Sequence, residues 1–176
     1  MTVCALSIVT AGSRSPSPER PERKAELERM AECLNWVTEN PARNYYDALQ
    51  GLFLYQICLA LEGNMHGMSW GRLDQYLGDF YERDIASGAL TPEFAQELLD
   101  MFFLKVAEMN KFWGDSGEYG VPGYTSGQLI TLGGVDREGK DATNGVTYMM
   151  LQCSGRLVLH DPPQALRIHD GTPDEL

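Results

Sequence analysis

Side chains that could bind a small substrate gather in one glycine-rich stretch, residues 62–76. His66 stands there between Met65 and Gly67, and an imidazole near neutrality can donate or accept a hydrogen bond from a substrate hydroxyl. A structural histidine bonded to loop carbonyls is the alternative. Arg72 and Asp74 follow two residues apart, and we interpret them as a buried ion pair that fixes the loop rather than as an anion site. The stretch is predicted to form the edge of a site.

Residues 134–141 imitate a phosphate-binding loop between a predicted strand and a predicted helix. The pattern fails at its last position, where Asp141 stands in place of the Ser or Thr that reaches Mg²⁺. Asp136 and Glu138 also place negative charge where phosphates would lie. A nucleotide-binding α/β protein is therefore only a minor alternative.

Two His-Asp pairs near the carboxyl end could in principle converge as a metal site: His160-Asp161 and His169-Asp170. Nothing else in their spacing matches a ligand framework, so a solvated turn and a strand end are the preferred interpretation. No metal is predicted.

The composition excludes several classes of partner. The 176 residues carry a net charge of −11 with only 14 Lys and Arg, which argues against nucleic acid and anionic membrane surfaces. No apolar run approaches the ~20 residues that a membrane span requires, and no targeting signal is evident. The cysteines show no C-x-x-C spacing, which predicts reduced thiols in a cytoplasmic protein. They are Cys4, Cys33, Cys58 and Cys153.

The elements that must position these residues are mostly helical. Residues 11–21 are rich in Pro and Ser, and we predict a flexible leader over residues 1–21. Apolar spacing predicts a helix up to Val37 that Asn40-Pro41 stops, and a fully buried helix over 45–61. Thr91-Pro92-Glu93 opens a further helix, which Gly114 ends. The helical part thus spans 22–114, and a glycine-rich loop follows over 114–127.

The last portion is predicted to be β-α-β over residues 128–168, with strands at 128–132 and 165–168 around a helix at 143–159. Two strands cannot cover both faces and both edges of a parallel sheet. From the residues alone we expect a piece of a larger fold, with one domain over 22–176.

Several separate blocks agree in order and spacing with a known family. They are 45–50, 62–66, 71–77 and 132–144, the last with Asp141-Ala142-Thr143-Asn144. Over about residues 21–176 the chain resembles the glycyl radical enzymes related to pyruvate formate-lyase. It is most similar to the branch of glycerol and propanediol dehydratases, choline trimethylamine-lyases and hydroxyproline dehydratases. The resemblance implies an α/β fold, the helix-rich portion of a ten-stranded α/β barrel, and cleavage of a carbon–heteroatom bond in a small hydroxylated or aminated substrate.

The resemblance also implies which residues face a substrate. His66 occupies the position of a substrate-binding His, while Gly67 replaces the family's Ser and removes one hydroxyl-binding group. Alignment through Gly133-Gly134 puts Val121 where the choline lyases carry an aromatic residue, and Tyr124 matches a nearby Tyr. Asn144 and Arg167 match positions that would cap a helix and tie strand to helix.

The family's thiyl Cys loop and radical Gly loop both lie beyond the end of this sequence. Cys153 belongs to a predicted helix, so no catalytic residue is expected in this chain, which alone would be inactive. The implied cofactor is a glycyl radical in the full-length enzyme, installed by a radical SAM activating enzyme. Expected partners are a small-molecule substrate, that activase and the remaining part of the enzyme, with a homodimer left open. Alternatives are a formate acetyltransferase-type or decarboxylase member, or a non-catalytic scaffold.

Overall fold

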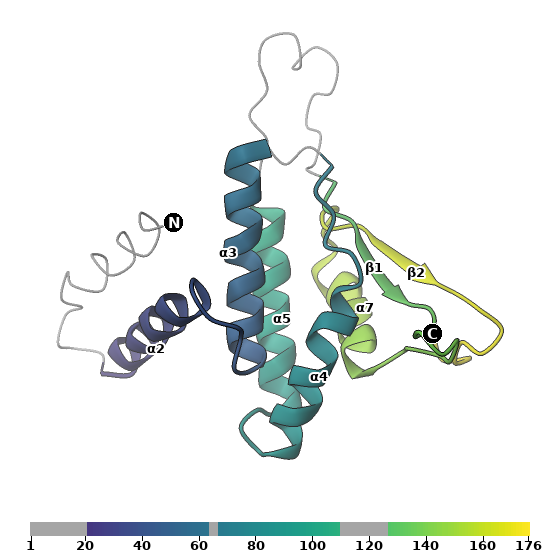
Figure 1. Ribbon diagram of the computed structural model, residues 1–176, viewed down its shortest axis with the longest axis horizontal. Helices are drawn as coiled ribbons and strands as arrows, with labels where there is room; N and C mark the ends of the chain where they lie inside the picture. Colours follow the sequence, from purple (N-terminus) through teal and green to yellow (C-terminus); the bar gives the residue numbers. More distant parts are fainter. Residues whose placement is uncertain (1–20, 64–66, 110–126) are drawn as a thin grey trace, which may run out of the picture. The chain divides into compact units, whose positions relative to one another are not determined.

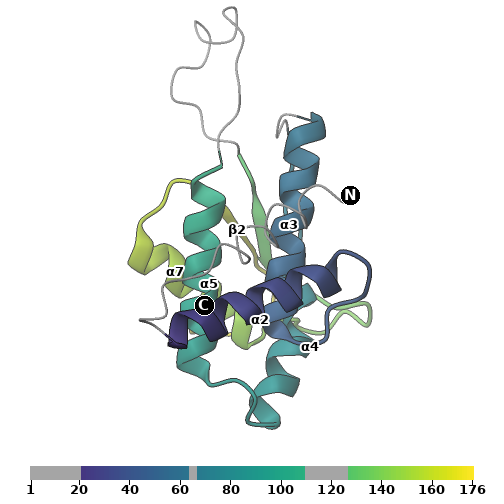
Figure 2. The ribbon, with the colours of Figure 1, turned by 90° about the vertical axis from the view of Figure 1, so that its left-hand side faces the viewer.

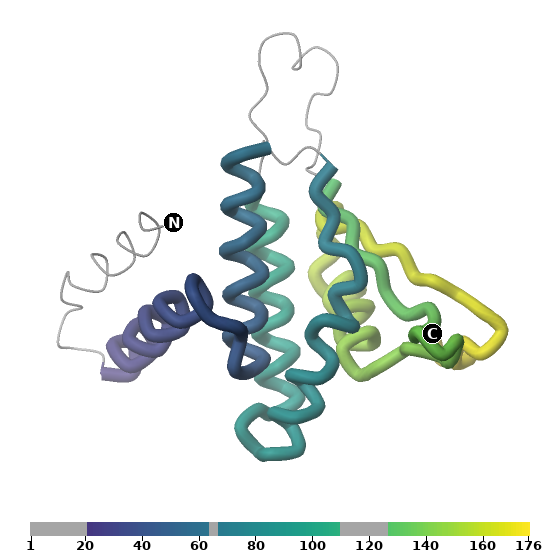
Figure 3. Tube along the Cα trace, in the orientation of Figure 1, coloured from purple at the N-terminus to yellow at the C-terminus, as the bar shows by residue number. Residues whose placement is uncertain are grey.

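A computed structural model describes residues 21–63, 67–109 and 127–176, which form five helices and two strands. In chain order these are α2 (Pro21–Val37), α3 (Tyr45–Gly63), α4 (Leu73–Ala86), α5 (Pro92–Ala107), β1 (Ile130–Gly133), α7 (Gly145–Leu157) and β2 (Gln164–Arg167) (Figures 1 and 3). Among these helices, none is long and apolar enough to cross a membrane.

The chain divides into two compact units, residues 1–52 and 53–176. In the described part of the first unit, α2 and the start of α3 form a small core that encloses the carboxylate of Asp47. Arg43 donates to the buried carboxylate of Asp47 at 2.6 Å and to Glu32 at 2.9 Å. The core residues of this unit are Cys33, Leu34, Tyr45, Ala48 and Leu49.

The second unit is built on a parallel pair of strands. β1 pairs with β2 in the register Ile130↔Gln164 to Gly133↔Arg167, and α7 is the crossover between them. Helices α4 and α7 pack on each other, α4 contacts β1, and α5 lies beside α7 (Figures 1 and 2). Ile130 and Leu132 are fully buried, whereas Thr131 between them, on the opposite face, is half-buried. The helices therefore cover the β1 face that carries Ile130 and Leu132.

The predicted elements at the carboxyl end are present with small shifts. β1 begins two residues later than the predicted strand, α7 is two residues shorter at each end, and β2 begins one residue earlier. The Asn144 side chain caps α7 by accepting from the backbone N–H groups of Val146 and Thr147. In return, the backbone N–H of Asn144 donates to the Thr147 hydroxyl. This capping box satisfies amides that a helix start leaves open. The boundaries of a leader over 1–21 and a domain over 22–176 stay predictions.

The cap of α5 follows the predicted pattern. The Thr91 hydroxyl accepts from the Phe94 N–H at 3.2 Å, and Pro92 is the first helical residue. The helix ends at Ala107, and the predicted stop at Gly114 lies outside the described residues.

Helix α4 was not predicted, because Gly78 and many polar residues interrupt its apolar pattern. Leu73 and Leu77 stand one turn apart on the buried face and are fully enclosed. Gly78 lies where a Cβ atom would come within 3.0 Å of the Asn144 amide nitrogen. The glycine that weakens the helical signal therefore permits close packing of α4 on the start of α7.

The prediction that α3 is fully buried is wrong. Its second half leaves Tyr55 64% and Leu61 78% exposed, and Cys58 is exposed as well. On the other side Gln56 is buried, and the Phe53 ring meets Phe102 of α5 edge-on at 6.3 Å. A helix that is apolar all round needs partners on every side. In the part of this unit that the structure describes, α5 supplies a partner for one side.

Candidate functional site

Of the four predicted substrate-binding residues, Gly67 is described, while His66, Val121 and Tyr124 lie outside the described residues. Gly67 is exposed and has a φ of +71°. A side chain at this φ costs roughly 1–2 kcal/mol. The backbone conformation thus gives a physical reason for Gly where the family resemblance leads one to expect Ser.

The segment after Gly67 runs parallel to β1. The Trp70 N–H donates to the Leu129 carbonyl at 2.9 Å, and the Thr131 N–H donates to the Gly71 carbonyl at 2.8 Å. Gly71 thereby forms a parallel bridge with Ile130, on the edge of β1 opposite β2. Gly67 and Gly127, the first described residues after 64–66 and after 110–126, both precede this bridge in the chain.

Gln128 is the centre of a buried polar cluster at this end of β1. Its side chain is fully enclosed, and its Oε1 accepts from Nε2 of Gln56 at 2.8 Å. Its Nε2 donates to the Val106 carbonyl at 3.1 Å, and its backbone N–H donates to Oδ1 of Asp161 at 3.1 Å. Gln56 and Asp161 are themselves buried. Because buried polar groups must be paired, this cluster fixes the relative positions of α3, α5 and β1.

The cluster lies among the described residues that flank 64–66 and 110–126, the stretches that contain His66, Val121 and Tyr124. Val106 precedes residues 110–126 and Gln128 follows them, and a hydrogen bond joins the two. Gln56 lies in the last turns of α3, shortly before residues 64–66. The side-chain amide of Gln128 therefore connects described residues that precede 64–66 and 110–126.

A second cluster holds the carboxyl-terminal end of β1. Arg72 donates to the carbonyls of Gly133 at 2.6 Å and Val135 at 2.9 Å, while the Asp74 carboxylate accepts from the Gly133 N–H at 2.8 Å. The prediction that Arg72 and Asp74 pair with each other is wrong, because none of the ion pairs among the described residues joins them. Instead, Asp74 binds the backbone N–H of Gly133 and Arg72 binds the carbonyl of the same residue.

Asp74 also connects α4 to α7. The Thr147 hydroxyl donates to Asp74 Oδ2 at 2.7 Å, and the Asn144 side-chain amide donates to the Asp74 carbonyl at 3.2 Å. Asp74 and Thr147 are fully buried. The predicted cap role of Asn144 is confirmed. Arg167 lies over Gly134, where an added Cβ would meet the Arg167 Cβ at 3.1 Å. Among the described residues, no hydrogen bond or ion pair of its side chain ties it to a helix.

The turn at 134–141 is closed by its own side chains. Oδ1 of Asp136 accepts from the backbone N–H of Glu138 at 2.9 Å and of Lys140 at 2.8 Å. In a phosphate-binding loop such amides point at the ligand. Here a carboxylate occupies them, which argues against the nucleotide-binding alternative.

The two His-Asp pairs do not converge. Nε2 of His169 bonds to Asp141 at 3.0 Å, whereas Asp161 bonds to Gln128. The described residues hold no group of three or more metal-ligating side chains.

A protein-family model matches most of the chain. The model of the family described as Pyruvate formate lyase-like matches residues 10–176. The chain belongs to this family.

Its relatives within the pyruvate formate lyase-like family are glycyl radical enzymes. An isethionate sulfite-lyase of Oleidesulfovibrio alaskensis is 39% identical over 166 residues, which cover 93% of this chain and 20% of the relative. A glycyl radical enzyme of Archaeoglobus fulgidus superposes with a TM-score of 0.85 at 31% identity, covering 97% of this chain and 22% of that one. The B12-independent glycerol dehydratase of Clostridium butyricum superposes with a TM-score of 0.86 at 33% identity. The match covers 97% of this chain and 21% of the dehydratase. The chain thus spans about a fifth of the length of these relatives, and its fold is a helix-rich part of the family's α/β barrel.

Sequence reasoning missed the central residues of the first cluster, Gln128, Gln56 and Asp161. One signal was available, because Gln56 interrupts an apolar helix and a buried amide requires a partner. The partner could not be named from the sequence, since Gln128 is 72 residues away.

Proposed function

We propose that this chain is the part of a glycyl radical enzyme that shapes one side of the substrate cavity, in an enzyme that cleaves a C–X bond of a small hydroxylated or aminated substrate. Family membership supports this proposal. So do the names of its relatives, which include a sulfite-lyase and a glycerol dehydratase. The observation that carries it is the Gln128 cluster, which anchors the flanks of both loops that contain the proposed substrate-binding residues. The proposed substrate-binding residues are His66, Gly67, Val121 and Tyr124.

The described cysteines do not fit the role of a thiyl-forming residue. Cys33 and Cys153 are buried in helices, and Cys153 donates to Asp100 at 2.9 Å. Burial and the neighbouring Asp47 raise the pKa of Cys33 to about 12. Cys58 stands on the exposed side of α3. We therefore assign the radical Gly, the thiyl Cys and the hydrogen abstraction to the rest of the enzyme, with a radical SAM activase as partner. A homodimer and a cytoplasmic location belong to the same proposal.

What this chain contributes is positioning. The parallel bridge at Gly71 and the amide of Gln128 hold two loop bases at one end of β1, so loop side chains start from fixed anchor points. Fixed anchors reduce the ordering cost that substrate binding would otherwise meet. Gly67, in its left-handed conformation, lets the chain turn directly after His66 without strain.

A chimeric enzyme tests the proposal in a complete protein. Residues 21–176 replace the matching segment of the O. alaskensis isethionate sulfite-lyase, and the chimera is activated anaerobically. Electron paramagnetic resonance measures the glycyl radical, and product analysis measures cleavage over a panel of hydroxylated and aminated substrates. We expect radical formation and cleavage of at least one C–X bond.

His66→Ala in the chimera then tests the substrate-binding role. We expect kcat/KM to fall by about 10-fold or more while the radical signal is unchanged, which corresponds to roughly 1.4 kcal/mol. His160→Ala is the matched control, because His160 is an exposed histidine on the same chain. A radical-bearing chimera that only transfers acyl groups or decarboxylates would overturn the proposed reaction type. A chimera that forms the radical and turns over nothing would favour the scaffold alternative.

A further inference from the structure

The second half of α3, residues 53–63, carries an apolar face that is open to solvent. Four side chains recur there at the spacing of one helical face, and we call them the open face of α3: Leu54, Tyr55, Cys58 and Leu61. Tyr55 is 64% and Leu61 78% exposed, Cys58 is exposed and Leu54 is half-buried. The one charged residue of this half is Glu62, in the last turn. Contiguous exposed apolar side chains of this kind mark interaction sites.

The opposite side of the same half of α3 already has its partners. The Phe53 ring meets the Phe102 ring of α5 edge-on at 6.3 Å, and Gln56 donates to Gln128 at 2.8 Å. Phe53 and Gln56 stand three residues apart, so they share one side of the helix, away from Cys58. Helix α5 and the residues before β1 therefore cover one side of α3 and leave the open face without a neighbour among the described residues.

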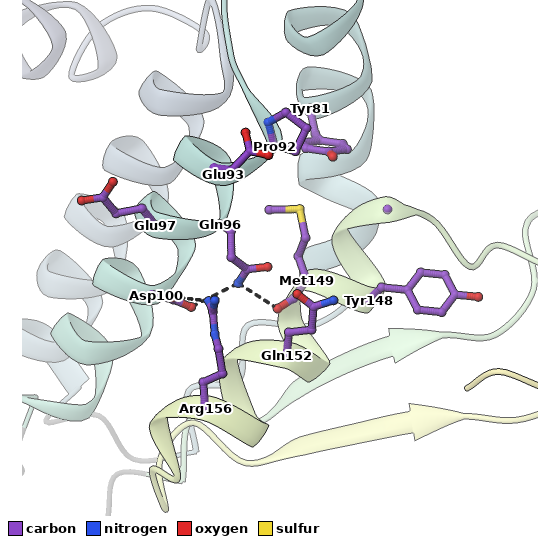
Figure 4. Close-up of a pocket in the computed structure, with 11 residues that line it drawn as sticks. Tyr81, Pro92, Glu93, Gln96, Glu97, Asp100, Tyr148, Met149, Gln152 and Arg156 are labelled. Atoms are coloured by element: carbon purple, nitrogen blue, oxygen red, sulfur yellow. Dashed lines mark hydrogen bonds and ion pairs between the residues drawn. The ribbon is translucent and has the colours of Figure 1, made fainter.

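Helix α5 cannot move to cover the open face, because its own far side is bound to α7. Nε2 of Gln96 donates to the Met149 carbonyl at 3.2 Å, and Asp100 forms an ion pair with Arg156 (Figure 4). A shift of α5 would break both contacts. The open face thus needs a partner from outside the elements that the structure describes.

The size of the open face distinguishes between two kinds of partner. Residues 54–61 of a helix make a strip about 12 Å long and about 10 Å wide. Each partner in a stable complex buries about 800 Å², so two copies of the chain would have too little area to bind through this face alone. Each copy also carries a net charge of −11, which adds repulsion. A strip of this size is instead typical of the contact between neighbouring elements within one core.

The similarity to longer proteins indicates where such a neighbour comes from. The chain covers 20% of the isethionate sulfite-lyase and 21% of the glycerol dehydratase, so about four-fifths of each relative is additional polypeptide. The sheet of the described residues has two strands, so the outer edge of β2 also lacks a neighbouring strand there. Native folds cover such edges. Two separate surfaces are therefore open in the manner of a segment taken from a larger core.

We propose that the open face of α3 is an interior surface of the complete enzyme, covered by an apolar segment of the remaining polypeptide. The covering segment packs aliphatic or aromatic side chains against Leu54, Cys58 and Leu61, while Glu62 stays at the rim. The proposal rests on the proposed function in one respect, that the chain is part of a longer enzyme. It does not depend on the radical, the substrate or the reaction.

The labelling rate of Cys58 tests this proposal in the unactivated chimera. A thiol reagent is applied at pH 8 to the isolated chain and to the chimera, and mass spectrometry assigns the modified cysteines. We expect Cys58 to react roughly 100-fold or more slowly in the chimera, because labelling then requires local opening. Glu138→Cys, on an exposed turn, is the control and should react at similar rates in both proteins. Equal rates for Cys58 in both proteins, or equal protection at both positions, would overturn the proposal.

Leu61→Glu tests whether the open face itself gives the protection. A carboxylate is costly to bury, so the substitution should speed Cys58 labelling in the chimera by about tenfold or more. In the isolated chain, where Leu61 is exposed, it should leave the labelling rate unchanged. The same change in both proteins would contradict a covered face.

Light scattering on the isolated chain tests the proposal even if the chimera does not fold. We expect a monomer at micromolar concentration. A dimer that Leu61→Glu dissociates would assign the face to a second copy and overturn the proposal. The labelling result is also separate from the test of the proposed function. Protection of Cys58 in a chimera without turnover would support this inference alone, and turnover with unprotected Cys58 would refute this inference alone.

Discussion

Gln56 donates a hydrogen bond of 2.8 Å from its Nε2 to Oε1 of Gln128, although 72 residues separate the two in the sequence. Both side chains are buried, so each amide is the partner that the other requires. The bond joins the second half of α3 to the residues directly before β1.

Gln128→Leu should lower the free energy of unfolding by about 3 kcal/mol, because it removes the side-chain hydrogen bonds to Gln56, Val106 and Asp161 and leaves the buried Nε2 of Gln56 without its acceptor. Urea denaturation measures the change. Gln152→Leu is the control, since Gln152 is exposed on α7, and it should change stability by less than ~0.5 kcal/mol. The double variant Gln56→Leu/Gln128→Leu should be less destabilised than the sum of the single variants. Simple additivity would mean that the two amides do not interact.

Acid should weaken the first unit through Asp47. Burial alone would raise the pKa of this carboxyl, but hydrogen bonds from Arg43 and Cys33 outweigh burial and hold its pKa below the usual range. A carboxyl that is more acidic in the folded state contributes stability above its unfolded pKa of about 3.9, and this contribution is lost as pH falls through the folded value.

Asp47→Asn should therefore cost about 2 kcal/mol at pH 7, with the gap to the parent chain closing below about pH 4. Denaturant unfolding between pH 2.5 and 7 measures both. Asp170→Asn, at an exposed position, controls for the change in net charge. A gap that stays constant with pH would show that Asp47 acts through packing rather than charge.

The three described cysteines should react at very different rates with a thiol reagent at pH 8. Cys58 is exposed and should react first, whereas burial raises the pKa of Cys33 and of Cys153. The thiolate is the reactive form, so the latter two should react only on unfolding. A Cys4→Ser background removes the fourth thiol, and mass spectrometry assigns the sites. Labelling of Cys153 in the native chain at the rate of Cys58 would contradict the packing of α5 on α7.

Two glycines should respond in opposite directions to alanine. Gly155 lies in helix α7 with open space around its missing Cβ, so Gly155→Ala should stabilise by roughly 0.5–1 kcal/mol. Gly134 has a φ of +82°, and a Cβ there would approach Arg167 to 3.1 Å. Gly134→Ala should destabilise by about 1–2 kcal/mol. Thermal unfolding measures both, with ~2–4 °C expected per kcal/mol in a chain of this size. If both variants changed the stability in the same direction, the backbone geometry described for one of the two glycines would be refuted.

The sequence predicted the elements whose signals are local. Caps act within a few residues, so Thr91 marked the start of α5 directly, whereas the cap role of Asn144 came from the family resemblance. The crossover from β1 through α7 to β2 followed from alternating patterns over short windows. Helix α4 escaped because Gly78 and the polar residues weaken its pattern, and Gly78 is explained only by the close approach of Asn144 at the start of α7.

The composition, the caps, the order of blocks and hence the family were determined by the sequence itself, since each depends on residue identity and short spacing. Which polar groups meet was decided by the tertiary structure alone. Arg72 and Asp74 are two residues apart, yet they bind opposite sides of Gly133 rather than each other. Gln56 finds its partner 72 residues away. The physical reason is that a buried polar group must pair with whatever donor or acceptor packing brings near, and packing is a property of the whole fold.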